Sequence, residues 1–521
     1  MPVSATVSRS RAPLGPPVSL RSPEDDEGKE ERFTCGSISN PCVDPRAVPW
    51  SVPRPMPSPF TISPATRTAT KDLLGLAWPV ILARLGIMTM GLTDVIVVGN
   101  YSSRELAFSS LALAPMSIVV TTAVGLMMGV QIMTARFLGE GRRQEVGAVF
   151  RRGVSYSLQL GVAAMLVLLL LGPLGLMHAG LADGLGEGAS PALRIFALSM
   201  PGYLVSVAAQ FFLEALHKPK AGMWAMWVAN GINLALNLLL VPDILGLGIH
   251  GAAASAWATF AARTSLAVFL IIYIARLPEA RALGVFLKPA RDPLAEREQR
   301  KVGYGAGSSY FIEVGAFAAM TFIAGQLGAI ETSAWAIVLN VSAIVFMVPM
   351  GLSAATAVLV GRAYGARDGR GVLRAGMVGI GVVTVLTVIV ALGLWAFAPV
   401  VASAYNRDPL LLAVVAPALV LATLFFVADG IQVVSASANR AAGDVWWPTI
   451  MHFGAYTLVM MPVGWVLAHR LGVDGLVWAV IVASLVSSVL LTGRFVRVAK
   501  RLPSPLAGEG GSRSEADEGF L

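Results

Sequence analysis

The sequence predicts an all-α membrane protein with twelve transmembrane helices in two pseudo-symmetric six-helix bundles. Three observations predict this fold class: an apolar composition, a series of apolar stretches of membrane length, and an internal repeat. Hydrophobic residues make up 55% of the 521 residues and charged residues only 13%, about half the ~25% that is usual in soluble domains. A soluble chain of this size has too much surface to cover with so few charges. The composition therefore excludes an ordinary soluble enzyme.

The two ends of the chain differ from its middle. Residues 1–70 hold 13 of the 31 prolines, and such a segment buries too little apolar surface to offset its ordering entropy. We therefore predict a disordered cytoplasmic extension over 1–70, which contains no apolar run of signal-peptide length. Translation starting at Met56 instead of Met1 is an open alternative. Residues 499–521 are Gly-rich and acidic in composition, and we predict a second disordered tail there.

Between the tails, twelve apolar stretches are long enough to cross a hydrocarbon core about 30 Å thick. The first six form a predicted N-terminal lobe, residues 71–275, and the last six a C-terminal lobe, residues 301–498. The longest connection, residues 276–300, is the predicted cytoplasmic loop between the lobes. The stretches are 73–98, 106–135, 149–172, 191–216, 221–242, 251–275, 301–327, 332–361, 372–399, 409–438, 445–468 and 473–497.

The Lys and Arg residues between these stretches predict the orientation of the chain. Nineteen of them, with Arg136, Arg362 and Arg440 counted as loop residues, fall on one side, and only three fall on the other. The positive-inside rule places the richer side, and both termini, in the cytoplasm. Orientation thus accounts for much of the net charge of +8, and we expect no nucleic-acid partner. We expect the protein in the inner membrane of a bacterium.

An internal repeat relates the two halves. The pattern from Gly125 through Arg136 to Gly139 recurs from Gly351 through Arg362 to Gly365, at a constant offset of 226. Each copy contains an even number of spans, so both halves keep the same orientation and the repeat is parallel. Two such bundles leave a cleft between them, which is the architecture of alternating access.

Three acids lie inside predicted spans: Asp94, Glu313 and Asp429. An ionisable residue at membrane depth costs several kcal/mol unless it is paired or hydrated, so each acid is a functional candidate; a structural carboxylate is the alternative. The acids do not obey the offset of 226, unlike the glycines and arginines. A carboxylate in an apolar cleft can exchange a proton, a metal cation and an organic cation, and such competition is what an antiporter requires. Glu214, at the end of a span, we expect to be solvated at the interface.

Other polar residues inside the spans have two interpretations each. Asn230, Asn233 and Asn237 could supply neutral oxygens to Na⁺, or could form hydrogen bonds that join helices. Arg84 and Arg263 pair with acids across helices or bind an anionic part of a substrate. The chain has no Walker A sequence, and its five histidines lack metal-ligand spacing. We therefore expect no enzyme activity, no cofactor and no tightly bound metal.

Several of these residues resemble the multidrug and toxic compound extrusion (MATE) family. The resemblance is carried by the stretches around Asp94 and Glu313, by residues 346–353 and by residues 360–365, and it covers roughly residues 70–498. The presence of both Glu313 and Asp429 is most similar to the NorM-type branch. Phe425 stands where NorM-like proteins can have a tyrosine, and this loss of an oxygen weakens the case for Na⁺.

The resemblance implies an exporter of amphiphilic, often cationic compounds that is driven by inward flow of Na⁺ or H⁺. It implies transient cation coupling at Glu313 and Asp429 in the C-terminal lobe, and an N-terminal site at Asp94 with Asn233 and Asn237. Candidates for the substrate cavity are Arg84, Arg263, Phe425 and Tyr310. We expect a monomer whose partners are a small amphiphilic substrate and the lipid bilayer. Alternatives are a lipid-linked oligosaccharide flippase of the same superfamily, favoured by the two arginines, and a non-transport membrane scaffold or membrane enzyme.

Overall fold

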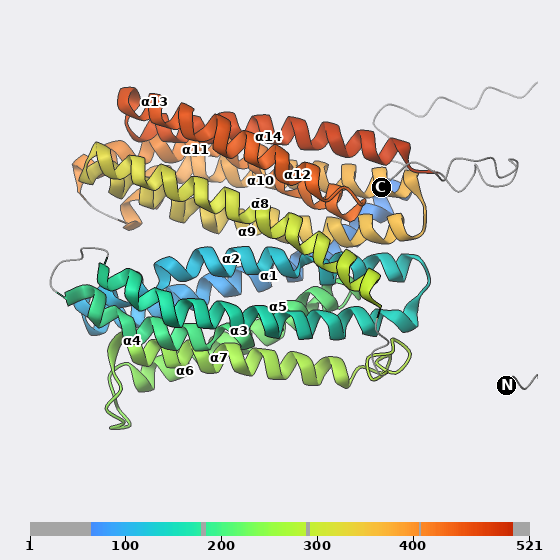
Figure 1. Ribbon diagram of the computed structural model, residues 1–521. Coiled ribbons are helices and arrows are strands. Elements are labelled where there is room, and N and C mark those ends of the chain that lie inside the picture. Colours follow the sequence, from blue (N-terminus) through green and yellow to red (C-terminus); the bar gives the residue numbers. More distant parts are fainter. Residues whose placement is uncertain (1–63, 179–183, 288–291, 406–407, 504–521) are drawn as a thin grey trace, which may run out of the picture. The chain divides into compact units, whose positions relative to one another are not determined.

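The computed structural model describes residues 64–178, 184–287, 292–405 and 408–503, and all regular structure within these ranges is helical (Figure 1). The predicted start at Met56 and most of both predicted tails lie outside the described residues. Seven α-helices and one short 3-10 helix, η1 Arg143–Glu145, form the first half. The α-helices are α1 Pro64–Tyr101, α2 Ser103–Gly139, α3 Val146–His178, α4 Leu185–Leu198, α5 Met200–Ala215, α6 Pro219–Leu240 and α7 Gly251–Ala275. The second half contains α8 Pro293–Leu327, α9 Ala329–Gly365, α10 Gly369–Tyr405, α11 Pro409–Ala441, α12 Trp446–His452, the π-helix η3 Phe453–Met460, α13 Met461–Leu471 and α14 Val473–Arg501.

The predicted fold class is confirmed. In the described part of the chain, eleven helices are long and apolar enough to cross a membrane, and a twelfth span forms if α4 and α5 count as one. These two helices meet at a bend of 41°. Pro201 lies just after the bend, and a proline removes a backbone donor and disfavours helical geometry in the residue before it. The eleventh span is continuous through η3, a wider helical turn of a kind often found at functional sites.

Several helices extend beyond the apolar stretches that predict them. Helix α8 begins at Pro293, inside the expected loop 276–300, because the Asp292 side chain accepts a hydrogen bond from the Ala295 backbone N–H. A capping acid followed by proline is a strong helix start. Helix α1 likewise begins at Pro64, inside the expected extension 1–70. Hydropathy misses these turns because they are polar.

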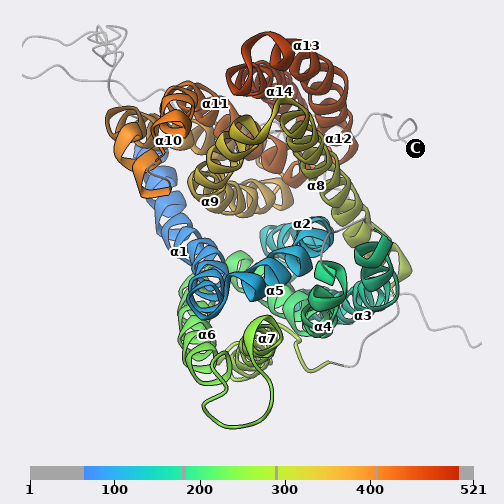
Figure 2. The same cartoon turned by 90° about the vertical axis from the view of Figure 1, so that its left-hand side faces the viewer.

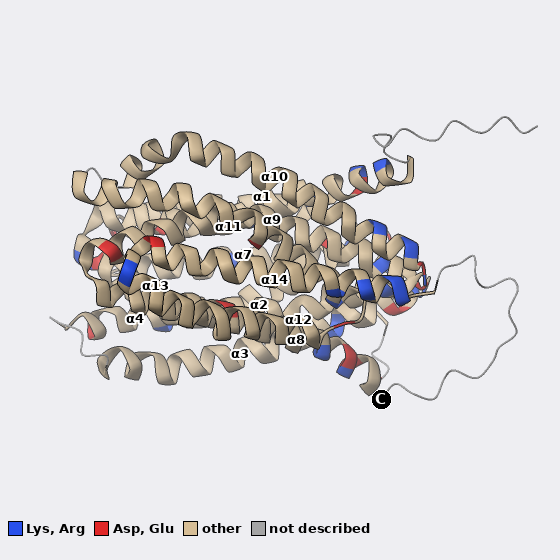
Figure 3. Cartoon of the chain, turned by 90° about the horizontal axis from the view of Figure 1, so that it is seen from above, with Lys and Arg blue, Asp and Glu red and all other residues tan. Residues whose placement is uncertain are grey.

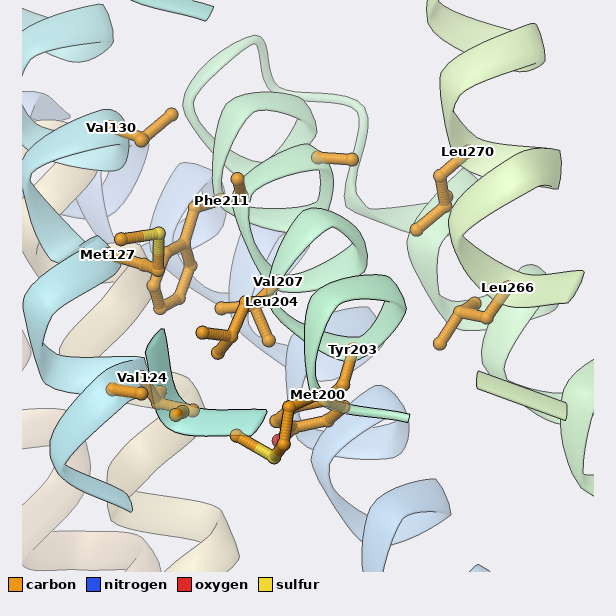
Figure 4. Packing of buried hydrophobic residues seen from close by; sticks show 14 of the residues in the cluster. Val124, Met127, Val130, Met200, Tyr203, Leu204, Val207, Phe211, Leu266 and Leu270 are labelled. Carbon is orange, nitrogen blue, oxygen red and sulfur yellow. The ribbon is translucent and has the colours of Figure 1, made fainter. Parts of the chain in front are cut away.

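The helices pack as two groups, α1–α7 and α8–α14, which Figure 2 shows almost end-on. Buried apolar side chains fill each group. In the first, α2, α5 and α7 contribute Met127, Leu204 and Leu270 (Figure 4). A third cluster joins the groups, since Leu73 of α1 and Ile132 of α2 belong to the same core as α9, α10 and α11.

The two groups meet along α2, which lies against α8 and α9. A Cβ atom added to Gly125 would stand 2.7 Å from the Cα atom of Gly307, a spacing that real Cβ atoms do not adopt. Glycine is therefore required at this crossing because backbone approaches backbone. Lys and Arg residues gather at one end of the helices (Figure 3), which we call the basic end.

Candidate functional site

A cavity of about 550 Å³ lies between the two groups of helices. Most of its wall is apolar and comes from α1, α2, α8, α9 and α11. Its polar lining includes Arg84, Tyr203, Tyr310, Glu313 and Asp429, and the Phe425 ring also faces it. The cavity thus brings together residues from both halves, such as Arg84 and Asp429, which are more than 250 positions apart in the sequence. Its two carboxylates lie on the wall formed by α8 and α11. Arg263 is not part of the lining.

Glu313 and Asp429 belong to a polar cluster in the second half. The Gln432 side-chain amide donates hydrogen bonds to the Asp429 carboxylate at 3.1 Å and to the Tyr456 hydroxyl at 3.0 Å. Both Gln432 and Tyr456 are also polar neighbours of Glu313. The Ser487 hydroxyl donates to the side-chain amide oxygen of Gln432 at 3.2 Å. The cluster therefore places two carboxylates and several neutral oxygens at the edge of the cavity.

Sequence reasoning missed Gln432 and Tyr456. Gln432 lies three residues after Asp429, so the same face of one helix presents both, and helical spacing could have identified it. Tyr456 lies in η3 and is fully buried. Its position depends on a π-helical turn that hydrophobic periodicity does not reveal. It supplies a hydroxyl near the acids, where Phe425 lacks one.

Asp94 forms a second, separate site within the first half. Its carboxylate accepts hydrogen bonds from the Asn237 amide at 2.8 Å, the Asn233 amide at 3.0 Å and the Thr259 hydroxyl at 2.7 Å. The side chain is 3% exposed, and α1, α6 and α7 surround it. The structure thus brings together Asp94, Asn233 and Asn237, as expected, but Asn230 instead bonds to backbone carbonyls of α1 and α6. Thr259 was missed.

The amide oxygens of Asn233 and Asn237 have no hydrogen-bond partner in the structure. Both nitrogens are used by Asp94 and its neighbours, so these buried oxygens are left as free acceptors. Buried acceptors of this kind are costly unless a donor or a cation meets them. Carboxylate and amide oxygens are hard ligands of the kind that Na⁺ takes, but the two amides present their nitrogens, and not these oxygens, to Asp94. Within the described residues, no group of three or more His, Cys, Asp and Glu side chains could hold a metal.

Arg84 forms an ion pair across helices. Its guanidinium lies 3.3 Å from the Glu214 carboxylate, and the Gln131 amide donates to the same carboxylate at 2.6 Å. The expectation that Glu214 is solvated at the interface is therefore wrong, since this residue is only 5% exposed. Helix α5 packs against α2, and Arg84 of α1 and Gln131 of α2 cover the acid near the end of α5. The position of Glu214 near the end of a predicted span does not reveal that neighbouring helices bury it.

Arg263 has no acidic partner within ion-pair distance among the residues that the structure describes. Its guanidinium donates to the Ser199 hydroxyl at 2.9 Å and stacks over the Tyr203 ring at 4.7 Å. Because Tyr203 lines the cavity, Arg263 supports the cavity wall from behind. It holds the bend between α4 and α5 at Ser199.

Several basic residues that were counted as loop residues lie within helices instead, and three of them are arginines with contacts inside the protein. Arg136, Arg362 and Arg440 belong to α2, α9 and α11, and Arg136 and Arg440 are 4% and 1% exposed. Arg440 donates to the Ser309 hydroxyl at 2.7 Å. The prediction that these arginines lie in loops is wrong. Hydroxyl and carbonyl oxygens inside the protein accept their hydrogen bonds, as water would in a loop, so the charges are tolerated within helices.

Comparison with known proteins identifies the family. The MatE family model matches the chain twice, over residues 79–239 and 306–466, one match in each half. The chain is 53% identical over 426 residues to a Caulobacter vibrioides protein named "Probable multidrug resistance protein NorM", covering 81% of this chain and 90% of the relative. A Neisseria meningitidis protein of the same name is 30% identical over 420 residues, covering 79% and 90%.

Solved structures show the same fold. A point mutant of the Vibrio cholerae MATE transporter VcmN superposes with a TM-score of 0.78 at 16% identity, covering 84% of this chain and 98% of the other. At that identity the likeness concerns the fold alone. The duplicated family match and the NorM relatives together lead to one conclusion: the chain belongs to the MatE family, and within it to the NorM-like proteins.

Proposed function

We propose that the protein is an ion-coupled antiporter that exports amphiphilic, mainly cationic compounds by alternating access between its two lobes. The observation that carries this proposal is the cavity between the lobes, with apolar and aromatic walls and two carboxylates on one side. An apolar wall accepts a hydrophobic body without directional contacts. Aromatic faces and carboxylates add attraction for a cationic group.

Ion coupling follows from competition at the acids. A bound cationic substrate near Glu313 and Asp429 favours their charged forms, and a proton or Na⁺ bound there removes the charge that attracts the substrate. Each ligand thus lowers the affinity for the other, which is the thermodynamic requirement for exchange. The driving ion is Na⁺ or H⁺, and both bind only transiently.

The Asp94 site supports a second coupling position in the N-terminal lobe. Asp94, Asn233 and Asn237 are buried and are not part of the cavity lining, so a large substrate does not reach them. Na⁺ binding through the free amide oxygens together with Asp94 would require the Asn233 and Asn237 amides to turn, because their nitrogens donate to the carboxylate. The two sites then have different roles: substrate and ion compete in the C-terminal lobe, and an ion binds without substrate in the N-terminal lobe.

The flippase alternative is less well supported by this geometry. It depends on Arg84 and Arg263 as a basic cavity lining. Arg84 is neutralised by Glu214 at 3.3 Å, and Arg263 lies behind Tyr203, so the cavity offers no unpaired arginine to an anionic headgroup.

We place the protein in the inner membrane of a bacterium, as a monomer with the basic end in the cytoplasm. The support is the gathering of Lys and Arg at one end (Figure 3) and the positive-inside rule. Labelling of single cysteines at the two ends in intact cells tests the orientation.

Efflux measurements test the proposal. Everted vesicles that contain the Glu313→Gln or Asp429→Asn variant should lose ion-driven ethidium efflux, while Glu187→Gln, at an exposed acid of α4, should behave as the wild type. A Na⁺ gradient imposed with the proton gradient collapsed then identifies the driving ion. Full ion-coupled efflux in both acid variants would overturn the proposed roles.

A further inference from the structure

We propose that Arg136 and Arg362 are symmetry-related positioning residues that hold the two lobes together at the basic end; this rests on the proposed alternating access. Arg136, in α2 of the N-terminal lobe, reaches the end of α11 in the C-terminal lobe. Its guanidinium donates to the Arg440 carbonyl oxygen at 2.9 Å and to the Ala441 carbonyl oxygen at 3.2 Å. It also stacks over the Tyr364 ring at 4.7 Å and contacts Glu298 at 3.3 Å.

Arg362 makes the reciprocal contact. From α9 of the C-terminal lobe, its guanidinium donates to the Ala215 carbonyl oxygen at 3.2 Å, at the end of α5 in the N-terminal lobe. At the repeat offset of 226, Arg136 is equivalent to Arg362, and Ala215 is equivalent to Ala441. Both the donor and the acceptor of one contact therefore have their counterparts in the other.

The chemistry of these contacts suits a connection that must open and close. The last carbonyl groups of a helix lack partners within the helix and carry the negative end of its dipole. A guanidinium from the other lobe satisfies those of Ala215 and Ala441, and it adds a second donor to the Arg440 carbonyl, which already accepts from the Gly443 N–H at 3.2 Å. Carbonyl oxygens that lose such a donor can be hydrated in the opened state. A buried carboxylate would instead be left with an uncompensated charge.

The backbone around the two arginines obeys the same symmetry. Gly139 and Gly365 are related by the offset of 226, and a Cβ atom on either one would overlap a carbonyl oxygen, that of Arg362 or Arg136 respectively. Helices α2 and α9 thus cross in direct backbone contact at the basic end. The lobes are closed there.

The cavity lies elsewhere along the same helices. Its α2 lining runs from Ser117 to Val124, at least twelve residues before Arg136, or about 18 Å along a helix. The arginines therefore do not touch a substrate. They act through closure, and access of the cavity to the basic end requires that both contacts break.

The two contacts differ in strength. Arg136 is 4% exposed and bonds two carbonyl oxygens and Glu298, whereas Arg362 is half-buried and bonds one. Loss of Arg136 should therefore open the basic end more than loss of Arg362. If the arginines served only to orient the chain in the membrane, replacing either one with lysine would have no effect, because the positive charge is kept. If Arg136 bridges two carbonyls, lysine fails there, because it lacks the planar fork of donors that spans them.

Spin labels test the proposal. Cysteines replace the exposed residues Lys220 and Arg370, one in each lobe at the basic end, in a chain without Cys35 and Cys42. The distance between the labels is measured by double electron–electron resonance in nanodiscs. We expect Arg136→Gln and Arg136→Lys to raise the ratio of the longer to the shorter distance by about tenfold, with a smaller rise for Arg362→Gln. Arg142→Gln is the matched control, since its ion pairs stay within one loop.

Unchanged distance distributions in all three test variants would refute the proposal, and so would an equal change in the Arg142→Gln control. Arg362→Gln keeps the test valid if Arg136 variants do not fold. The measurement needs neither substrate nor ion. If the variants shift the label distances but the wild-type protein shows no efflux, only the proposed function is refuted. If the wild-type protein shows efflux but the variants leave the label distances unchanged, only this inference is refuted.

Discussion

The buried ion pair between Arg84 and Glu214 leads to a quantitative prediction. The two groups lie 3.3 Å apart with side chains 3% and 6% exposed. At an effective dielectric constant of about 20, this separation corresponds to an attraction of about 5 kcal/mol. Removing one partner leaves the other charge buried and uncompensated, at a cost of about 3–5 kcal/mol. Gln131 can still donate to Glu214, which places Arg84→Met near the lower end of that range.

A double-mutant cycle measures this coupling. We expect Arg84→Met and Glu214→Leu each to lower the free energy of unfolding by about 3–5 kcal/mol, and the double variant to lie near the wild type, because both charges are then gone. Unfolding of purified protein in detergent, followed by tryptophan fluorescence, gives the four values. Additive losses in the double variant would show that the pair is not coupled and would refute the reasoning.

Three further predictions follow from single contacts. Thr259→Val removes the hydroxyl that donates to Asp94 at 2.7 Å and should cost about 1.5–3 kcal/mol in the same unfolding assay; an unchanged value would show that the bond does not stabilise the fold. Gln432→Leu removes the amide between Asp429 and Tyr456 and should slow ion-coupled efflux about tenfold, whereas wild-type rates would exclude Gln432 from the coupling site. Gly365→Leu places a side chain against the α2 backbone and should lengthen the distance between the spin labels at the basic end; the wild-type distribution would show that the crossing is not tight.

The spans could be predicted from the sequence because the bilayer imposes a length and a composition on each. Their ends could not, since the polar turns of α1 and α8 beyond the apolar stretches follow capping and not hydropathy. The break between α4 and α5 has a visible signal in Pro201, yet a single proline also occurs inside α1, α2 and α3 without ending them. Tertiary packing decides which proline breaks a helix.

The Asp94 site was largely predictable because Asn233 and Asn237 are four residues apart on one helix face. Thr259 was not, because threonine is common in membrane helices and no spacing relates it to an acid on α1. The partners of Arg84 and Arg136 were equally hidden. A charge near the end of a span looks the same in the sequence whether it meets water or, like Glu214, a partner on another helix.

The internal repeat distinguishes the residues that close the lobes from the acids at the candidate sites. Residues that close the lobes obey the offset of 226, as Arg136 and Arg362 do. At another equivalent pair of positions the charges are opposite: Glu214 in one lobe corresponds to Arg440 in the other. Glu214 meets Arg84 and is neutralised, whereas Tyr310 occupies the position equivalent to Arg84.

This asymmetry sets the charge of the C-terminal site. No acid lies within ion-pair distance of Arg440 in the described part of the chain; its guanidinium donates instead to the Ser309 hydroxyl, about one helical turn before Glu313 on α8. With both carboxylates ionised, Glu313, Asp429 and Arg440 together carry one net negative charge. We propose that one bound proton, one Na⁺ or one monovalent organic cation neutralises that charge, and that a second would leave a buried positive excess. On this proposal, the opposite charges at equivalent positions suit the C-terminal site to the exchange of one cation for one other.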